Sequence, residues 1–200
     1  MNWQPRGIVY GVLLNNQREA DALAPRMHEK PYQGSPRAPI LYVKTANTFS
    51  AEGAWVRTPR PVEIGATVGL VIGAGGAVVQ HVLVNDWTLP HANFFRPPVK
   101  FKCRDGFLGL GTPVAPVDIA TASIDVLVNG ELRQTVRFDA LVRPPARLLA
   151  DVAEFMTLRE GDVLLAGCDV ARPLAQAGDR VELRGGALGT LAQQLVEEDA

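Results

Sequence analysis

The residues best suited to chemistry lie in one stretch of the chain, Val84 to Gly111. It places two Lys, two Arg and two Asp among aromatics, Pro and Gly, and apolar β-type runs flank it. Loops of this length are uncommon in a compact domain unless they are functional or disordered, and the aromatic content argues against disorder. We therefore expect a functional loop that leaves one strand and returns to another. The alternative is a solvated connection without a role.

A reactive thiol is one candidate within that loop. Cys103 stands between Lys102 and Arg104, and neighbouring cations make a thiol more reactive. No His lies close by in sequence to act as its base, so a bystander thiol is the simpler interpretation. The other cysteine, Cys168, is far away, and neither belongs to a CxxC or Cys/His pattern. The cysteines thus indicate neither a disulfide framework nor a zinc site.

Composition bounds the class of protein. The 200 residues are 47% hydrophobic, which suits one domain, residues 1–200, with a real core. A net charge of -1 and scattered Lys and Arg argue against a nucleic-acid partner. No stretch approaches the roughly 20 apolar residues that span a bilayer, and the short apolar run Gly7–Leu14 is not followed by a signal-peptide cleavage pattern. We expect a cytoplasmic protein without a membrane partner.

The order of apolar runs predicts a mostly β domain with a few helices, in the α+β class. Asn129-Gly130 is the strongest hairpin signal, and Gly73–Gly76 joins another pair of strands. Pro144-Pro145 opens the one convincing helix. The polar stretch Arg26–Arg37, interrupted by Pro and Gly, predicts that residues 15–37 include a mobile surface segment or lid. The expected strands are Gly7–Leu14, Ile40–Lys44, Thr67–Ile72, Ala77–Val84, Ile124–Val128, Leu132–Phe138, Val163–Ala166, Arg180–Leu183 and Ala187–Val196.

Several strings in chain order resemble the fumarylacetoacetate hydrolase family. They are Asn85-Asp86, Lys102-Cys-Arg-Asp-Gly106, Val128-Asn-Gly-Glu-Leu-Arg-Gln134 and Thr157-Leu-Arg-Glu-Gly-Asp162. More narrowly, Leu89-Pro90, Phe95-Arg96-Pro97 and Gly65-Ala-Thr-Val68 resemble the amino-terminal half of the bifunctional isomerase/decarboxylases of homoprotocatechuate (4-hydroxyphenylacetate) degradation. The likeness runs over nearly the whole chain.

The resemblance implies a twisted β-roll of mixed short sheets with a divalent ion at its mouth. Two Glu on one strand and an Asp on the next would hold the ion, since residues i and i+2 of a strand point to the same side and carboxylates bind hard dications. The metal would withdraw charge from the enolate of a keto acid. A Lys, and a His/Glu pair on the lid, would handle substrate charge and protons.

Two residues of this chain match that apparatus, and two Arg are added as candidates for substrate binding. By resemblance, Asp86 corresponds to the third metal ligand and Lys102 to the catalytic Lys, either as a vestige or as a contact to substrate. Arg96 and Arg104, in the same stretch of the chain, are the candidate substrate-binding residues. The alternative for Asp86 is a strand-end carboxylate that binds loop amides or pairs with Lys102 or Arg104. For Lys102 it is a structural ion pair.

The other positions depart from the family pattern. The two metal-binding Glu fall on Gly65 and Thr67, and the lid His and Glu fall on Glu19 and Ala22. One carboxylate is too few to hold Mg²⁺ against its reluctance to shed water. We therefore expect no cofactor on this chain alone, and Mg or Mn in a sister chain.

Two functions from different classes follow. The first is a subunit, non-catalytic or weakly catalytic alone, of an enzyme of the 5-carboxymethyl-2-hydroxymuconate isomerase / 5-oxopent-3-ene-1,2,5-tricarboxylate decarboxylase type. Its partner would be a metal-bearing sister of the same fold or a second copy, and its ligand a small dicarboxylic or tricarboxylic keto acid or enol. The second is an independent metal-free enzyme that enolises or decarboxylates a dicarboxylic keto acid, with Lys102 as electrophile.

Overall fold

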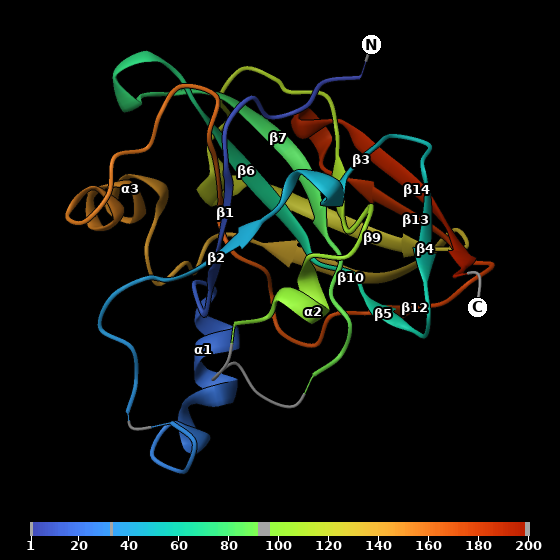
Figure 1. Cartoon of the computed structure of the whole chain (residues 1–200), viewed down its shortest axis with the longest axis horizontal. Coiled ribbons are helices and arrows are strands. Elements are labelled where there is room, and N and C mark those ends of the chain that lie inside the picture. The colour runs from blue at the N-terminus through green and yellow to red at the C-terminus, as the bar shows by residue number, and fades with distance from the viewer. Residues whose placement is uncertain (1, 33, 92–96, 199–200) are drawn as a thin grey trace.

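A computed structural model describes residues 2–32, 34–91 and 97–198 of the chain (Figure 1). These residues contain fourteen strands and three α-helices. The strands are β1 Val9–Leu13, β2 Ile40–Lys44, β3 Phe49–Ala51, β4 Trp55–Thr58, β5 Val62–Glu63, β6 Ala66–Ile72, β7 Val78–Asp86, β8 Leu108–Leu110, β9 Ser123–Val128, β10 Glu131–Arg137, β11 Val163–Leu165, β12 Leu174–Ala175, β13 Arg180–Arg184 and β14 Thr190–Glu197. The α-helices are α1 Gln17–Leu23, α2 Val99–Lys102 and α3 Pro145–Ala153. Short 3-10 helices cover Ala24–Arg26, Ala46–Thr48, Ala74–Gly76, Ile119–Thr121 and Gly186–Leu188.

The strands form two main sheets and one small one. The larger sheet has the order β2-β1-β11-β6-β7-β8-β3, the second has the order β10-β9-β13-β14-β4, and β12 pairs with β5. The pairs β1–β11, β3–β8 and β4–β14 are parallel, and the remaining pairs are antiparallel. The predicted fold class, mixed β-sheets with few helices, is confirmed.

Strand β6 is the centre of the larger sheet. All seven of its residues are buried, as expected for a continuous apolar run covered on both faces. It pairs with β7 in the register Ala66↔Asn85, and the Asp86 amide donates to the Gly65 carbonyl at 2.9 Å. The main core contains buried residues from both large sheets, so it lies between them. The hairpin therefore places Gly65, Thr67 and Asp86 side by side.

Most longer elements lie where the sequence predicts them. Strand β2 has the expected bounds, and the hairpins β6–β7 and β9–β10 turn at the expected glycines. The expected loop between Val84 and Gly111 contains the helix α2 and the short strand β8. The sequence did not predict this helix, which ends at Lys102.

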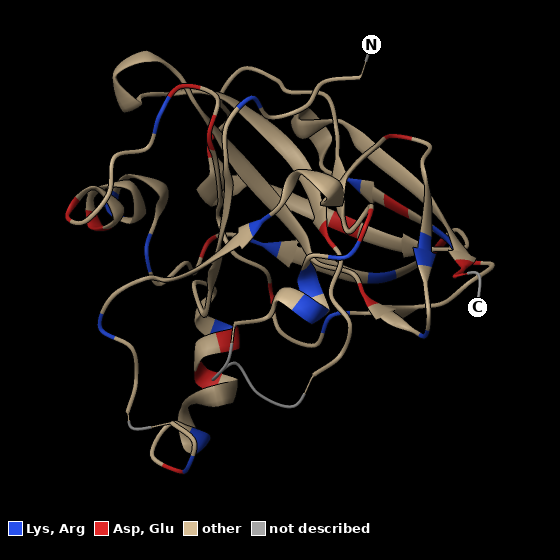
Figure 2. Cartoon of the chain, viewed as in Figure 1, with Lys and Arg blue, Asp and Glu red and all other residues tan. Residues whose placement is uncertain are grey.

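The segment 15–37 begins with α1 and leads to β2. Figure 1 shows α1 and the chain that follows it extending away from the sheets. Figure 2 shows Lys and Arg interspersed with Asp and Glu along the ribbon, without one large basic face in view. No helix in the described ranges is long and apolar enough to cross a membrane.

Candidate functional site

Asp86 is the last residue of β7, and its side chain is fully buried. Its Oδ2 accepts hydrogen bonds from Lys102 Nζ, at 2.6 Å, and from the Tyr42 hydroxyl. Its Oδ1 lies 2.9 Å from Lys44 Nζ. That contact lacks hydrogen-bond geometry, and Oδ1 has no hydrogen-bond partner among the described residues, so the contact is an ion pair. One carboxylate therefore holds two ammonium groups and a phenol, a set that we call the Asp86 cluster.

Helix α2 delivers Lys102 to this cluster. Lys102 Nζ also donates to Thr88 Oγ1 at 2.7 Å and lies 4.5 Å from the centre of the Tyr42 ring. Its side chain is 1% exposed. Thr88 and Asp86 are two residues apart in the chain, and residues at that spacing in an extended segment share a side. Lys102 and Asp86 thus form the ion pair that the sequence analysis gives as the alternative to a site role for each.

Strand β2 delivers the other two members, Tyr42 and Lys44, which are also two residues apart. Tyr42 stands opposite Gly11 in the β1–β2 register, and a Cβ on Gly11 would lie 2.0 Å from a ring carbon. The glycine thus leaves the space that the ring fills. Lys44 is fully buried, and its Nζ donates to the carbonyl oxygens of Lys102 and, at 2.7 Å, Phe107.

Burial and charge act in opposite directions in the Asp86 cluster. Burial alone would raise the pKa of Asp86, but the ammonium groups of Lys102 and Lys44 hold that pKa well below its ordinary value. Burial lowers the pKa of Lys44, and Asp86 opposes that effect. Burial and the neighbouring carboxylate raise the pKa of Tyr42. Asp86 is thus an anion and Tyr42 a neutral hydrogen-bond donor at neutral pH.

These residues do not fit a divalent metal. Mg²⁺ and Mn²⁺ require several oxygen ligands, carboxylates above all. In the described ranges, no group of three or more His, Cys, Asp and Glu could hold a metal ion. A Cβ on Gly65 would stand 2.3 Å from the Asp86 carbonyl oxygen, and the Thr67 hydroxyl donates to the Gly167 carbonyl at 2.7 Å. A dication beside Asp86 would also meet the positive charge of Lys44 and Lys102.

A second set of buried charges lies under α1. Arg172 donates to Glu19 and Glu63, with its Nη1 3.2 Å from Glu63, and its side chain is 8% exposed. Glu19 also accepts from the Leu14 amide at 2.9 Å, which ties the start of α1 to the end of β1. These three charged residues line a cavity of about 410 Å³ together with Arg26, Asp169 and apolar side chains. Glu19, at the position of the family's lid His, is therefore part of an ion pair.

The remaining predicted residues lie apart from Asp86 or outside the description. Arg104 pairs with Glu198 near the carboxyl end of the chain. Arg96 lies outside the described residues. Cys103 is partly exposed and donates weakly to the Val43 carbonyl. Both cysteines are free, and burial raises the pKa of Cys168 to about 12, so this thiol is not a nucleophile at neutral pH.

Sequence reasoning missed Tyr42, Lys44 and Arg172. One signal was present for the first two. The strand Ile40–Lys44 was predicted with its correct bounds, and a Tyr and a Lys two residues apart on a strand share one side. Nothing in the local sequence of Arg172 indicates that it reaches Glu19, which is 153 residues away along the chain.

Comparison with known proteins identifies the family and the fold of this chain. A sequence profile described as fumarylacetoacetate (FAA) hydrolase C-terminal matches residues 8–196. The chain belongs to the fumarylacetoacetate hydrolase family. Relatives in this family include the 4-hydroxyphenylacetate degradation bifunctional isomerase/decarboxylase of Escherichia coli, 32% identical over 96% of this chain and 48% of the relative. A homoprotocatechuate catabolism bifunctional isomerase/decarboxylase of Escherichia coli is 31% identical with the same coverage. This chain spans about half the length of these relatives.

Solved structures of the fumarylacetoacetate hydrolase family share the fold. The 5-carboxymethyl-2-hydroxymuconate delta-isomerase of Mycobacterium smegmatis superposes with a TM-score of 0.78 at 22% identity, covering 96% of this chain and 80% of that one. The fumarylpyruvate hydrolase of Pseudomonas aeruginosa, solved with Mn²⁺ and pyruvate, gives 0.77 at 21% identity, covering 96% and 90%. At these identities the likeness establishes the architecture.

Proposed function

We propose that this chain is one subunit of an isomerase/decarboxylase of the 4-hydroxyphenylacetate degradation type, and that a metal-bearing sister chain of the same fold performs the metal-dependent chemistry. Two findings support it. The similar relatives are named as bifunctional enzymes about twice the length of this chain. The Asp86 cluster lacks the oxygen ligands that a dication requires. The substrate would be a small dicarboxylic or tricarboxylic keto acid or enol.

The observation that carries the proposal is that side chains of this chain already contact both carboxylate oxygens of Asp86. Both of its oxygens contact ammonium groups, and Lys44 and Lys102 are 0% and 1% exposed. Lys102 Nζ is buried against Asp86 and Thr88, away from any substrate in this arrangement, and a dication at Asp86 would meet the positive charge of Lys44 and Lys102. This arrangement supports a role in assembly for the chain and leaves Mg²⁺ or Mn²⁺ to the sister.

Turnover with and without the sister tests this role. We expect the purified chain to leave 5-carboxymethyl-2-hydroxymuconate unchanged, and the reaction to appear when a chain of the same fold that carries both metal-binding Glu is added with Mg²⁺. An absorbance assay of the substrate measures both. Full turnover by this chain alone after treatment with a chelator would instead favour an independent metal-free enzyme. In that case Lys102→Met should abolish the activity.

Metal affinity is a separate check. We expect Mg²⁺ or Mn²⁺ to bind no tighter than about millimolar, because Gly65 and Thr67 supply no charge. Isothermal titration calorimetry on the wild-type chain and on Asp86→Ala measures this. A micromolar site that disappears in Asp86→Ala would show that residues other than those at positions 65 and 67 bind the metal together with Asp86.

A further inference from the structure

Lys44 occupies an oxygen cage deep in the protein. Its ammonium contacts Asp86 Oδ1 at 2.9 Å, the Phe107 carbonyl at 2.7 Å and the Lys102 carbonyl. An ammonium group has three N–H donors, and three oxygens surround this one. Lys44 is among the largest fully buried side chains of the protein. The Lys44 ammonium, buried with its side chain, therefore makes two hydrogen bonds to backbone carbonyls and one ion pair to Asp86.

The three oxygens come from different parts of the fold. Asp86 ends β7, Lys102 ends α2, and Phe107 immediately precedes β8. Lys44 itself ends β2, at the edge of the larger sheet. One cation thus joins β2 to the end of β7 and to the segment that runs from α2 to β8. A carboxylate with two backbone carbonyls is also the kind of ligand set that proteins use for hard cations.

The charge around the cage selects a monovalent cation. Asp86 supplies the one carboxylate, and its other oxygen already binds the Lys102 ammonium. A second monovalent cation is balanced in part by this carboxylate and in part by the two carbonyl dipoles. A dication would leave a larger excess of positive charge in a buried place, which is costly.

We propose that the Asp86, Lys102 and Phe107 oxygens form a binding site for a primary ammonium ion, that Lys44 fills it from within the chain, and that the site accepts a free alkylammonium when the Lys44 side chain is removed. Lys44→Ala deletes three methylene carbons and the ammonium group. The missing fragment is n-propylammonium, which is the predicted ligand of the emptied site. This proposal does not depend on the partnership with a sister chain.

Chemical rescue tests it. Lys44→Ala should unfold at a temperature lower by about 10 °C, because it removes the cation beside Asp86 Oδ1 and the donor to the Lys102 and Phe107 carbonyls and leaves a cavity. Increasing n-propylammonium chloride should raise the melting temperature of this variant in a saturable way and leave the wild type unchanged. Differential scanning fluorimetry measures both. Equal concentrations of n-propanol, which fills the same volume without charge, should rescue little.

A matched variant separates charge from volume. Lys44→Met keeps a long apolar side chain and lacks the ammonium, so it should be destabilised and insensitive to n-propylammonium. If Lys44→Ala is recovered unfolded, refolding from denaturant with either additive makes the same comparison, and folding should occur with the amine. The proposal is overturned if Lys44→Ala melts like the wild type, if n-propanol rescues as well as the amine, if Mg²⁺ or Mn²⁺ rescues and the amine does not, or if refolding fails with both additives.

Discussion

At the scale of single residues, Asp86 carries the electrostatic balance of the buried cluster. Its carboxylate lies between the ammonium groups of Lys44 and Lys102, and all three side chains are 0% or 1% exposed. A buried pair adds modestly to stability, but removal of one partner leaves an uncompensated charge in a low dielectric. The effect of a substitution at Asp86 should therefore be much larger than the strength of either ion pair suggests.

We expect Asp86→Asn to lower the free energy of unfolding by about 3–5 kcal/mol, because two buried ammonium groups would face each other across a neutral amide. Urea denaturation followed by fluorescence measures the change. Glu131→Gln is the matched control, since Glu131 pairs with Arg133 but its side chain is 72% exposed. It should change stability by less than about 1 kcal/mol. Similar losses in both variants would contradict the account.

His81 is a buried residue whose protonation should make the free energy of unfolding depend on pH. It is 5% exposed, and its Nδ1 accepts a hydrogen bond from the Val117 amide at 3.1 Å. Burial lowers the pKa of His81 below its ordinary value of 6.5. The unfolded chain therefore takes up the proton at a higher pH than the folded chain does.

The free energy of unfolding should be fully retained above pH 6.5 and should fall as the pH drops below it, until folded His81 is protonated as well. Denaturation curves between pH 8 and pH 5 measure this. His81→Gln keeps an acceptor for the Val117 amide and does not titrate, so its stability should vary less over this range. An identical pH profile in the variant would rule out His81 as the cause.

At the scale of elements, Arg172 fixes α1 against the sheets. Its guanidinium binds Glu19 on α1, Glu63 on β5 and the Asp169 carbonyl. Seven residues of helix are too few to be stable alone in water, so α1 depends on such contacts. The mobility of residues 15–37 is still a prediction, and this contact restrains their amino-terminal part.

Arg172→Met should increase amide hydrogen exchange in α1 by at least about tenfold, because Glu19 would lose its buried partner and local opening would become easier. Mass spectrometry of exchange over residues 17–23 measures this. Arg147→Met is the control, since Arg147 is 69% exposed and pairs within α3. Unchanged exchange in α1, or an equal increase throughout the chain, would contradict a local role.

The sequence predicts elements of five or more residues better than it predicts shorter ones. β2, β6 and β7 carry long apolar runs, and Asn129-Gly130 specifies the turn of a hairpin. Strands β3, β5, β8 and β12 have two or three residues, too few to show a period. They form because neighbouring backbone offers partners, which is information that a local pattern lacks.

Only part of the candidate site could be predicted from the sequence, because its contacts join residues that are far apart in the chain. Asp86 and Lys102 were found through resemblance, whereas hydropathy places a Lys such as Lys44 on the surface. Its burial depends on three oxygens that come together only when β2, β7 and α2 are assembled. Such a long-range coincidence leaves no trace in the residues around Lys44.

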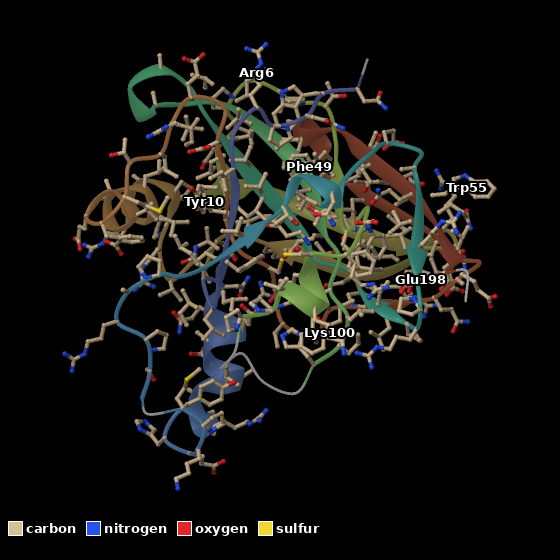
Figure 3. All side chains as sticks on the ribbon, in the orientation of Figure 1. Arg6, Tyr10, Phe49, Trp55, Lys100 and Glu198 are labelled. Atoms are coloured by element: carbon tan, nitrogen blue, oxygen red, sulfur yellow. The ribbon has the colours of Figure 1, made fainter. Side chains whose placement is uncertain are left out.

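At the scale of the whole molecule, one edge of the second sheet has an unusual surface. Strand β4 is last in its sheet, with β14 on one side and no strand on the other in the described part of the chain. Trp55 on this strand is 75% exposed, and Figure 3 shows it pointing outward. Exposed strand edges invite pairing, and Trp is enriched at the centres of interfaces.

We expect the purified chain to sediment as a dimer or larger at tens of micromolar, and Trp55→Lys to shift it toward the monomer by placing a charge on the association surface. Analytical ultracentrifugation measures both. Phe155→Lys is the control, because Phe155 is also an exposed aromatic residue, at 61%, but it follows α3 and is not part of the sheet that contains β4. A monomeric wild type, or dissociation by Phe155→Lys alone, would place the interface elsewhere or remove it.

The close approach of Gly65 to Asp86 also limits how this protein can evolve. A Glu at position 65 would bring a Cβ to 2.3 Å from the Asp86 carbonyl oxygen, so the two backbones would have to separate before the new carboxylate could be used. A Glu at position 67 would in addition remove the Thr67 hydrogen bond to Gly167. Each single codon change therefore lowers stability before any metal binding repays it. Selection acting one substitution at a time would remove these intermediates, and a lineage with this sequence would keep Gly65 and Thr67.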